Sequence, residues 1–238
     1  MSEMLRRVMM LMNKSSASAN DPYFNNVVLL MHFNTTTTDV KGHGMTISGA
    51  VGSDTTNKKF GSGSFSFPGA AYLYTPDSPD WTLGTGDWTA ECWYRGTVNP
   101  AAYGTILMQC PADGSTGDRG GPWFAINSTG KVQGGFWVGG TQYYAAGTTT
   151  VTDGNWHHIA IVRSGGNIYA FTDGVLEGTN STVTGIGTVD STQSLVIGQF
   201  GAYPDYYLVG NLDDLRLTKG IARYTSGFTV PTTQFPDA

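Results

Sequence analysis

Carboxylates that could act as a catalytic acid and base are scarce in this chain. Its three glutamates, Glu3, Glu91 and Glu177, lie far apart in the sequence. Glycoside hydrolysis of the usual kind needs two carboxyl groups about 5 to 9.5 Å apart, and no Glu-x-Asp-x-x-Glu run supplies such a pair. Gly-x-Ser-x-Gly, His-Glu-x-x-His and P-loop motifs are also absent. The sequence therefore predicts that the protein is not an enzyme.

Aromatic side chains are the second group of residues that could recognise a ligand. Sugar rings offer one apolar face and many hydroxyls, so a site for them needs exposed aromatic rings beside hydrogen-bonding groups. Tyr and Trp are also enriched in protein–protein contacts. Sugar binding and protein contact therefore both remain open for the aromatic residues expected in loops or on an open face. These candidates are Trp137, Tyr143, Tyr144, Tyr203, Tyr206 and Tyr207. Trp88, Trp93 and Trp156 fall at strand positions that indicate the core.

The two cysteines, Cys92 and Cys110, each lie in or at the end of a strand-like run. The simpler interpretation is that both are small buried hydrophobic residues. A disulfide between them is the alternative, and it requires their two strands to be neighbours.

Composition excludes several classes of protein. Charged residues make up 13% of the 238 positions, 33 residues are glycine, and the net charge is −5. Helical bundles need far more Ala, Glu, Lys and Leu, and a chain with 39% hydrophobic residues can bury enough surface to fold. A net negative chain has no basic excess for binding nucleic acid. No apolar run reaches the 18 residues that would predict membrane insertion.

Short strands must position these residues. Apolar or alternating runs recur from residue 27 to residue 217, with turn residues between them every 8 to 20 positions or so. This pattern predicts an all-β fold, an antiparallel two-sheet jelly-roll sandwich in one domain over residues 21–238. Asp173-Gly174 predicts a tight hairpin, and the one plausible short helix lies near residues 220–224.

The first 20 residues differ from the rest and are expected to form a docking or oligomerisation tail with its linker. Five of the eight methionines lie in the first twelve positions, and the apolar run is too short for a secretory signal. The residues expected to make the contact are Met4, Leu5, Arg6, Arg7, Val8, Met9, Met10, Leu11 and Met12.

Five sequence runs, in the right order, resemble one known family. The runs are residues 29–39, 59–67 (KFGSGSFSF), 86–93 (GDWTAECW), 155–163 (NWHHIAIVR) followed by 169–174 (YAFTDG), and 210–217 (GNLDDLRL). Together they resemble the strands of the laminin-G/pentraxin-like branch of the concanavalin A-like lectin/glucanase superfamily. The resemblance covers residues 25–236 and implies a jelly-roll sandwich of the concanavalin A-like type. The shortage of glutamates departs from the glucanase branch of that superfamily.

The same resemblance implies roles for three kinds of residue. One histidine of the pair His157 and His158 would be structural and bond across the sandwich. A structural Ca²⁺ would join the loop after the first strand to the closing strand through Asp39 and Asp213, with backbone carbonyls from residues 59–62. Oxygen ligands of this kind suit that hard cation.

Residues 218–232 (TKGIARYTSGFTVPT) resemble the variant of this module found in virion proteins of tailed bacteriophages. This resemblance implies a non-enzymatic, lectin-like tail fibre or adhesin on the particle surface, with host-surface polysaccharide and other virion proteins as partners. A homo-oligomer, preferably a trimer, would make weak single-site binding useful through avidity. The alternative is a structural capsid decoration or tail protein that binds only viral neighbours, and a glycoside hydrolase is the third possibility.

Overall fold

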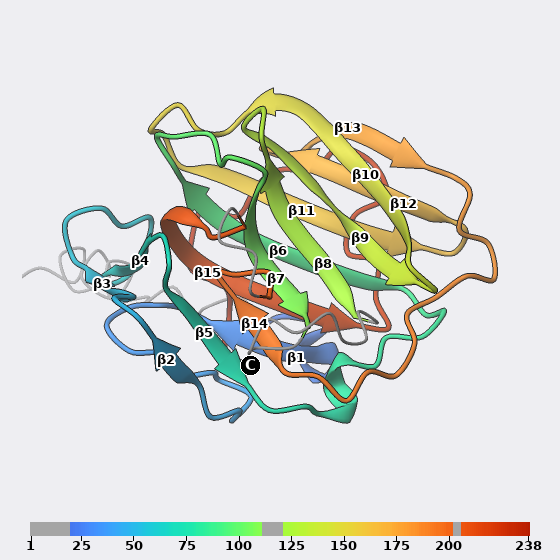
Figure 1. The fold of residues 1–238 in the computed structure, drawn as a ribbon, viewed down its shortest axis with the longest axis horizontal. Coiled ribbons are helices and arrows are strands. Elements are labelled where there is room, and N and C mark those ends of the chain that lie inside the picture. Colours follow the sequence, from blue (N-terminus) through green and yellow to red (C-terminus); the bar gives the residue numbers. More distant parts are fainter. Residues whose placement is uncertain (1–19, 111–120, 202–205) are drawn as a thin grey trace, which may run out of the picture.

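The computed structural model describes residues 20–110, 121–201 and 206–238, and the expected docking tail lies outside these residues. The described chain folds into two antiparallel sheets, so the predicted two-sheet sandwich is confirmed (Figure 1). Two short 3-10 helices, η1 (Phe24–Asn26) and η2 (Pro79–Trp81), are the helices among these residues. Neither of these two helices is long and apolar enough to cross a membrane.

We call the eight-stranded sheet sheet A. Its strands run in the order β13-β12-β11-β6-β15-β4-β3, and β1 pairs with β15 beside that path. The bounds are β1 (Val27–Met31), β3 (Gly52–Asp54), β4 (Ser64–Pro68), β6 (Trp88–Arg95), β11 (His157–Ser164), β12 (Asn167–Thr172), β13 (Val175–Asn180) and β15 (Val209–Lys219).

We call the seven-stranded sheet sheet B, with the order β10-β9-β8-β7-β14-β5-β2. The bounds are β2 (Thr46–Ser48), β5 (Tyr72–Thr75), β7 (Tyr103–Gln109), β8 (Pro122–Asn127), β9 (Lys131–Val138), β10 (Thr141–Thr150) and β14 (Leu195–Ile197). In Figure 1 the strands of the two sheets overlie each other along the line of view.

The main core lies between the sheets, because successive side chains of a strand point to opposite faces. In β8, Phe124 and Ile126 point into this core, as do Val132 and Phe136 in β9. Trp88 is fully buried here, as expected from the sequence. Trp93, expected in the core as well, is 3% exposed but lies on the other face of β6, against Phe60 and His158. Trp156 instead lies half-buried just before β11. One face of each sheet therefore packs on the core, and its other face points away from it.

The Asp173-Gly174 hairpin is confirmed between β12 and β13. Both residues have positive φ, 49° for Asp173 and 78° for Gly174, which is the backbone that this two-residue turn requires. A Cβ on Gly174 would also lie 2.1 Å from the carbonyl oxygen of Phe228. The hairpin therefore packs tightly against the C-terminal segment.

The C-terminal segment, residues 220–238, crosses the outer face of sheet A, and we call it the strap. The rings of Tyr224 and Phe228 stack at 3.6 Å, and both lie against Phe171 of β12. The strap ends where Asp21 donates its backbone N–H to the carbonyl of Ala238. The short helix expected near residues 220–224 does not form. Arg223 and Tyr224 are instead drawn to the acids Asp21 and Glu91 below the strap.

Both cysteines are buried and no disulfide joins them, so the disulfide alternative is wrong. Cys92, on β6 of sheet A, faces the core between the sheets. Cys110 follows β7 of sheet B and packs in a separate cluster. Burial raises the pKa of the Cys92 thiol well above its ordinary value, which keeps it an unreactive core residue.

Candidate functional site: the aromatic face of sheet B

Sheet B carries a second apolar cluster on the face turned away from the core. In β8 the alternate residues Trp123 and Ala125 belong to this cluster, and Met108 of β7 and Val196 of β14 join them. We define the aromatic face by the rings that gather here. They are Tyr72, Tyr74, Tyr103, Trp123, Trp137, Tyr144, Phe200 and Tyr206.

Strand register places part of the face in one row across the sheet. Tyr74 pairs with Val196, Val196 with Met108, and Met108 with Trp123. Trp123 then pairs with Gly135 of β9, and Gly135 pairs with Tyr144 of β10. Because Gly135 has no side chain, the rings of Trp123 and Tyr144 approach each other over it, with centroids 6.4 Å apart and planes at 84°.

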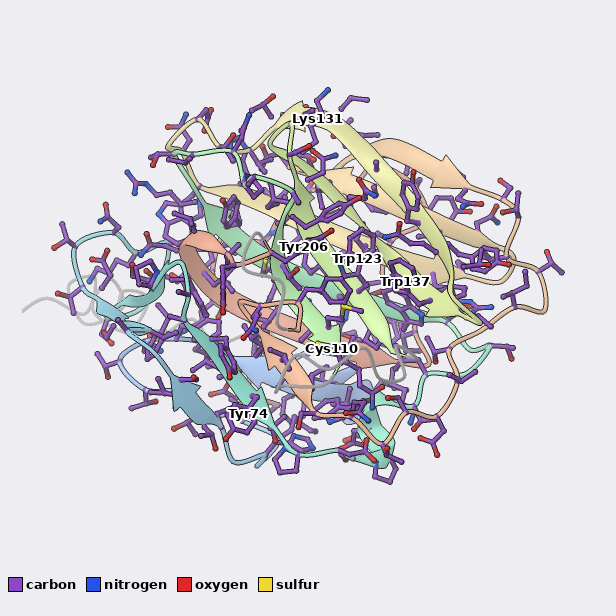
Figure 2. All side chains as sticks on the ribbon, viewed as in Figure 1. Tyr74, Cys110, Trp123, Lys131, Trp137 and Tyr206 are labelled. Atoms are coloured by element: carbon purple, nitrogen blue, oxygen red, sulfur yellow. The ribbon has the colours of Figure 1, made fainter. Side chains whose placement is uncertain are left out.

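The rings differ in how much solvent they meet. Trp123 is 2% exposed and forms the floor of the face, whereas Tyr144 is 41% exposed. Tyr103 contacts Trp123 edge to face at 5.2 Å and Tyr206 at 5.5 Å. The remaining tyrosine and tryptophan rings are half-buried. Figure 2 shows Trp123, Trp137 and Tyr206 gathered near Cys110, with Tyr74 farther along the same face.

Hydrogen-bonding groups lie beside the rings in the next row of the sheet. Thr105 of β7 pairs with Ala125, which pairs with Gln133 of β9. The Thr105 hydroxyl is buried and has no hydrogen-bond partner in the described part of the chain. Gln133 accepts a 3.3 Å hydrogen bond from the Asn127 side chain. The face thus combines apolar rings with neutral polar groups.

Charge is nearly absent from this sheet. Lys131, at the start of β9, is the one charged residue in the seven strands of sheet B that the structure describes. Lys131 and Trp137 lie six residues apart on one strand, and a strand rises about 3.3 Å per residue. About 20 Å therefore separates the lysine backbone from that of the tryptophan, and Figure 2 shows them toward opposite ends of the strand.

Three of the six predicted aromatic residues, Trp137, Tyr144 and Tyr206, come together on this face. Tyr143 does not, because its neighbour Tyr144 takes the outward position. Its ring packs against the core and stacks on Phe136 at 5.7 Å. Tyr207 is half-buried, and Tyr203 lies outside the described residues.

Sequence reasoning missed Tyr72, Tyr74, Tyr103 and Trp123, which lie in strands and were not among the loop or open-face candidates. The available signal was the alternation within residues 122–127, where Trp123 and Phe124 must point to opposite faces. Both are buried, so a fully apolar strand hides which of its two faces points away from the core.

The two residues named for calcium differ in what their oxygens already bind. The Asp39 carboxylate accepts N–H groups from Leu30, Lys41 and His43, the last through both its backbone and its ring. These four donors occupy the acceptor sites of the carboxylate, so Asp39 does not fit as a calcium ligand.

One carboxylate oxygen of Asp213 could still act as a ligand. Its Oδ2 accepts the backbone N–H groups of Lys59 and Phe60, whereas Oδ1 is buried with no partner in the described residues. Burial raises the pKa of Asp213 to about 7, and the nearby Asp214 adds to the rise. In the described part of the chain no three His, Cys, Asp or Glu side chains are grouped as a metal site would require. The calcium prediction now depends on Asp213 and stays a prediction.

Glu91 is held in a buried ion network under the strap. Arg216 donates to its Oε1 at 2.7 and 3.0 Å, and His158 and Tyr224 lie 3.1 and 2.9 Å from Oε2. Burial alone would raise the pKa of Glu91, but the Arg216 guanidinium brings it well below its usual range. Glu91 is fully buried and belongs to sheet A, so it lies away from the aromatic face.

The adjacent histidines have separate structural partners. His158 is fully buried and bonds to Glu91 of the neighbouring strand. His157 lies between two aspartates, 2.7 Å from Asp173 and 3.1 Å from Asp153. Both rings therefore tie strands or turns of sheet A together.

Solved structures with a similar fold are binding domains. The binding domain of Paraclostridial Mosquitocidal Protein 1 superposes with a TM-score of 0.65 at 10% identity, over 84% of this chain and 50% of that one. The binding domain of botulinum neurotoxin DC, solved in complex with rat synaptotagmin II, gives 0.61 at 14% identity, over 90% and 50%. This chain thus spans about half the length of those toxin chains.

A third structure matches over nearly its whole length. Domain 4 of AbnA, an extracellular GH43 arabinanase from Geobacillus stearothermophilus, was solved with arabinotriose. It gives a TM-score of 0.61 at 16% identity, over 83% of this chain and 94% of that one. No curated protein sequence matches this chain.

The family assignment is supported by the sequence as well as by the fold. The model of one family matches residues 67–221, which is more than half of the chain and runs from within β4 to the second residue of the strap. This chain belongs to the concanavalin A-like lectin/glucanase superfamily.

Proposed function

We propose that this domain is a non-enzymatic carbohydrate-binding module that holds sugar on the aromatic face of sheet B. The observation that carries the proposal is the gathering of eight aromatic rings on the sheet face that the core does not use. An apolar ring face packs against a sugar ring, and the tyrosine hydroxyls can donate and accept hydrogen bonds to its hydroxyls.

The most exposed parts of the face suit a ligand that approaches from solvent. Tyr144 offers its ring at the edge of the sheet, and Trp123 provides a buried floor beside it. Trp137 pairs with Gln142 across β9 and β10, which places an amide next to the indole. A ring with a neighbouring amide is the combination that sugar recognition uses.

The described acids favour binding over hydrolysis. Glu91 is buried in ion pairs on sheet A. Glu177 accepts hydrogen bonds from Thr148, Thr149 and Thr172. Neither carboxylate is available beside the aromatic face to act as one of the two groups that hydrolysis needs.

At a finer level, we propose that the module is displayed on the particle of a tailed bacteriophage as a fibre or adhesin. Support comes from the resemblance of residues 218–232 to the virion variant of the module. The contacts that the strap makes are consistent with a run of residues that acts as one structural unit. Arg223 pairs with Asp21, Tyr224 bonds to Glu91, and Phe228 stacks on Tyr224.

A glycan array tests the binding proposal directly. The full chain should bind at least one host-surface glycan. Trp137→Ala and Tyr206→Ala should weaken that binding by about tenfold or more, or about 1.4 kcal/mol. Tyr23→Ala is the matched control, because Tyr23 is 42% exposed and lies at η1, away from the face. Thermal melting checks that each variant is folded. Absence of binding to every glycan, or equal loss in the control, would contradict the proposal.

Particle assembly tests the finer proposal. The full chain should be incorporated into phage particles, and a chain lacking residues 1–14 should be excluded from them while keeping its glycan binding. Incorporation without the tail would show that attachment uses another surface. Reducing sugar released from host polysaccharide would instead favour an enzyme.

A further inference from the structure

We infer that the aromatic face takes an uncharged glycan, a chain of neutral sugars without carboxylate, sulfate or phosphate groups. The inference rests on the proposed function and adds the class of ligand to it. Its basis is the distribution of charge between the two sheets, which the overall net charge of −5 conceals.

Nearly all strand charges belong to sheet A. Its strands contain Asp54, Glu91, Arg95, Arg163, Glu177, Asp213, Asp214, Arg216 and Lys219. The seven strands of sheet B contain Lys131. An even distribution of ten charges over sheets of similar size would not produce this contrast, so one sheet presents an almost neutral surface.

Three of the four arginine and lysine side chains of sheet A are already engaged elsewhere. Arg216 is bound to Glu91 and Asp21, and Arg163 donates to the carbonyl oxygens of Gly84 and Ile186. Lys219 donates to the carbonyl of Pro79. These groups belong to the sheet on the other side of the core, and none supplies a counter-charge at the aromatic face.

An acidic sugar would therefore lose its hydration on this face without gaining a partner from the strands that the structure describes. Burying a charge is costly unless a group of opposite charge or several hydrogen bonds replace the water. Lys131 lies about 20 Å along the strand from Trp137, beyond the Debye length of about 8 Å at physiological ionic strength. It lies nearer to Tyr103, which pairs with Asn127, the residue whose side chain accepts the Lys131 backbone N–H. Among the described strands, the uncharged part of the face is therefore the end that carries Trp137 and Tyr144. A net negative chain also repels polyanions at long range.

A neutral sugar meets groups that match it. Its apolar face can lie on Tyr144 or Trp137, and its hydroxyls can bond to tyrosine hydroxyls and to Gln142. These partners are neutral, so the hydrogen bonds formed do not depend on ion pairing. Binding of this kind changes little with salt, because no counterions are released.

Affinity electrophoresis of the full chain provides the test. Gels would contain one neutral polysaccharide each (arabinan, dextran, galactomannan or mannan) or one acidic polysaccharide each (polygalacturonate, alginate, hyaluronate or polysialic acid). We expect retardation by at least one neutral polymer and by no acidic one. Retardation should change by less than about twofold between about 20 and 500 mM NaCl, a range over which screening removes exposed ion pairs.

Two variants connect the result to the face. Lys131→Ala should leave neutral binding unchanged, as should its matched control Lys58→Ala, whose side chain is exposed between β3 and β4. Trp137→Ala should lose the retardation, whereas Tyr23→Ala should keep it.

The outcomes separate this inference from the proposed function. Retardation by acidic polymers alone, lost at high salt or in Lys131→Ala, would overturn the neutral-ligand inference and leave a carbohydrate-binding module in place. Failure to bind any polymer in the gels or on the glycan array would overturn both. The rings would then serve only to pack the outer face of sheet B.

Discussion

The rings of Trp123 and Tyr144 meet edge to face at 6.4 Å although their strands, β8 and β10, are not neighbours. β9 lies between them, and its residue in the shared row is Gly135. A larger residue there would occupy the space that the two rings now share. The aromatic face therefore depends on a residue without a side chain.

Gly135→Ala is expected to destabilise the fold. A Cβ at this position would lie 2.0 Å from the carbonyl oxygen of Tyr143, which is backbone and cannot rotate away. Overpacking of this kind typically costs about 1–3 kcal/mol, measured by urea unfolding. Gly44→Ala is the control, because a Cβ there meets nothing within 4 Å. Equal stability of the two variants would mean that β9 and β10 can separate without cost.

Tyr143 and Tyr144 are expected to respond oppositely to truncation. Tyr143→Ala removes a ring that packs on the core and should lower the free energy of unfolding by about 2 kcal/mol or more, with glycan binding kept in the folded fraction. Tyr144→Ala removes an exposed ring and should weaken binding with a stability change within about 0.5 kcal/mol. Denaturant unfolding and array binding, measured on both, would reveal the opposite pattern if Tyr143 were the contact residue.

Glu91→Gln is expected to be strongly destabilising. Removing the carboxylate leaves Arg216 and Arg223 with Asp21 as their remaining acid, and breaking a buried pair costs about 3–5 kcal/mol. Asp190→Asn serves as the control, since Asp190 is exposed and accepts one bond from Thr82. Thermal and urea unfolding measure the difference, and a loss no larger than in the control would mean that the network adds little.

The stability of the chain should depend on pH through His157. Its hydrogen bond to Asp173 raises its pKa above the ordinary 6.5, against the effect of burial, and Asp153 contributes to the rise. A raised pKa in the folded state gives stability that is fully present below pH 6.5 and is lost as the pH rises through the folded value. His157→Gln should flatten the profile of melting temperature above pH 6. An unchanged slope in the variant would assign the titration to another group.

Calcium is expected to raise the melting temperature relative to EDTA, because a cation on Oδ1 of Asp213 would bind the folded chain and not the unfolded one. Asp213→Asn should abolish the increase, since an amide oxygen carries no charge. Asp54→Asn is the control, as that carboxylate already accepts bonds from Thr56, Asn57 and Asn211. Identical melting curves of the unchanged chain in calcium and EDTA would remove the calcium prediction.

Local patterns were sufficient for much of the fold. Short apolar runs bounded by turn residues, such as residues 122–127, predict strands, and Asp173-Gly174 predicts its hairpin because both residues tolerate positive φ. These are properties of near neighbours in the chain. The five family-like runs likewise resembled the superfamily to which the chain belongs.

Only part of the candidate site could be predicted from the sequence. Trp137 and Tyr144 were found because they stand near turns, whereas Trp123 was hidden in an apolar strand buried on both faces. Cys92 and Cys110 show the same limit, since nothing local to either one indicates that they belong to different sheets.

The sequence by itself determined that this protein is a β-sandwich with few charges and few glutamates, because strand periodicity and composition are local. Only the tertiary structure decided which face of each strand meets the core and which charges share a sheet. Those properties follow from pairings between distant segments, such as Glu91 with Arg216 and Met108 with Trp123. A shift of one residue in any such register would turn every side chain of that strand to the other face, so the aromatic face exists only once the sheets have formed.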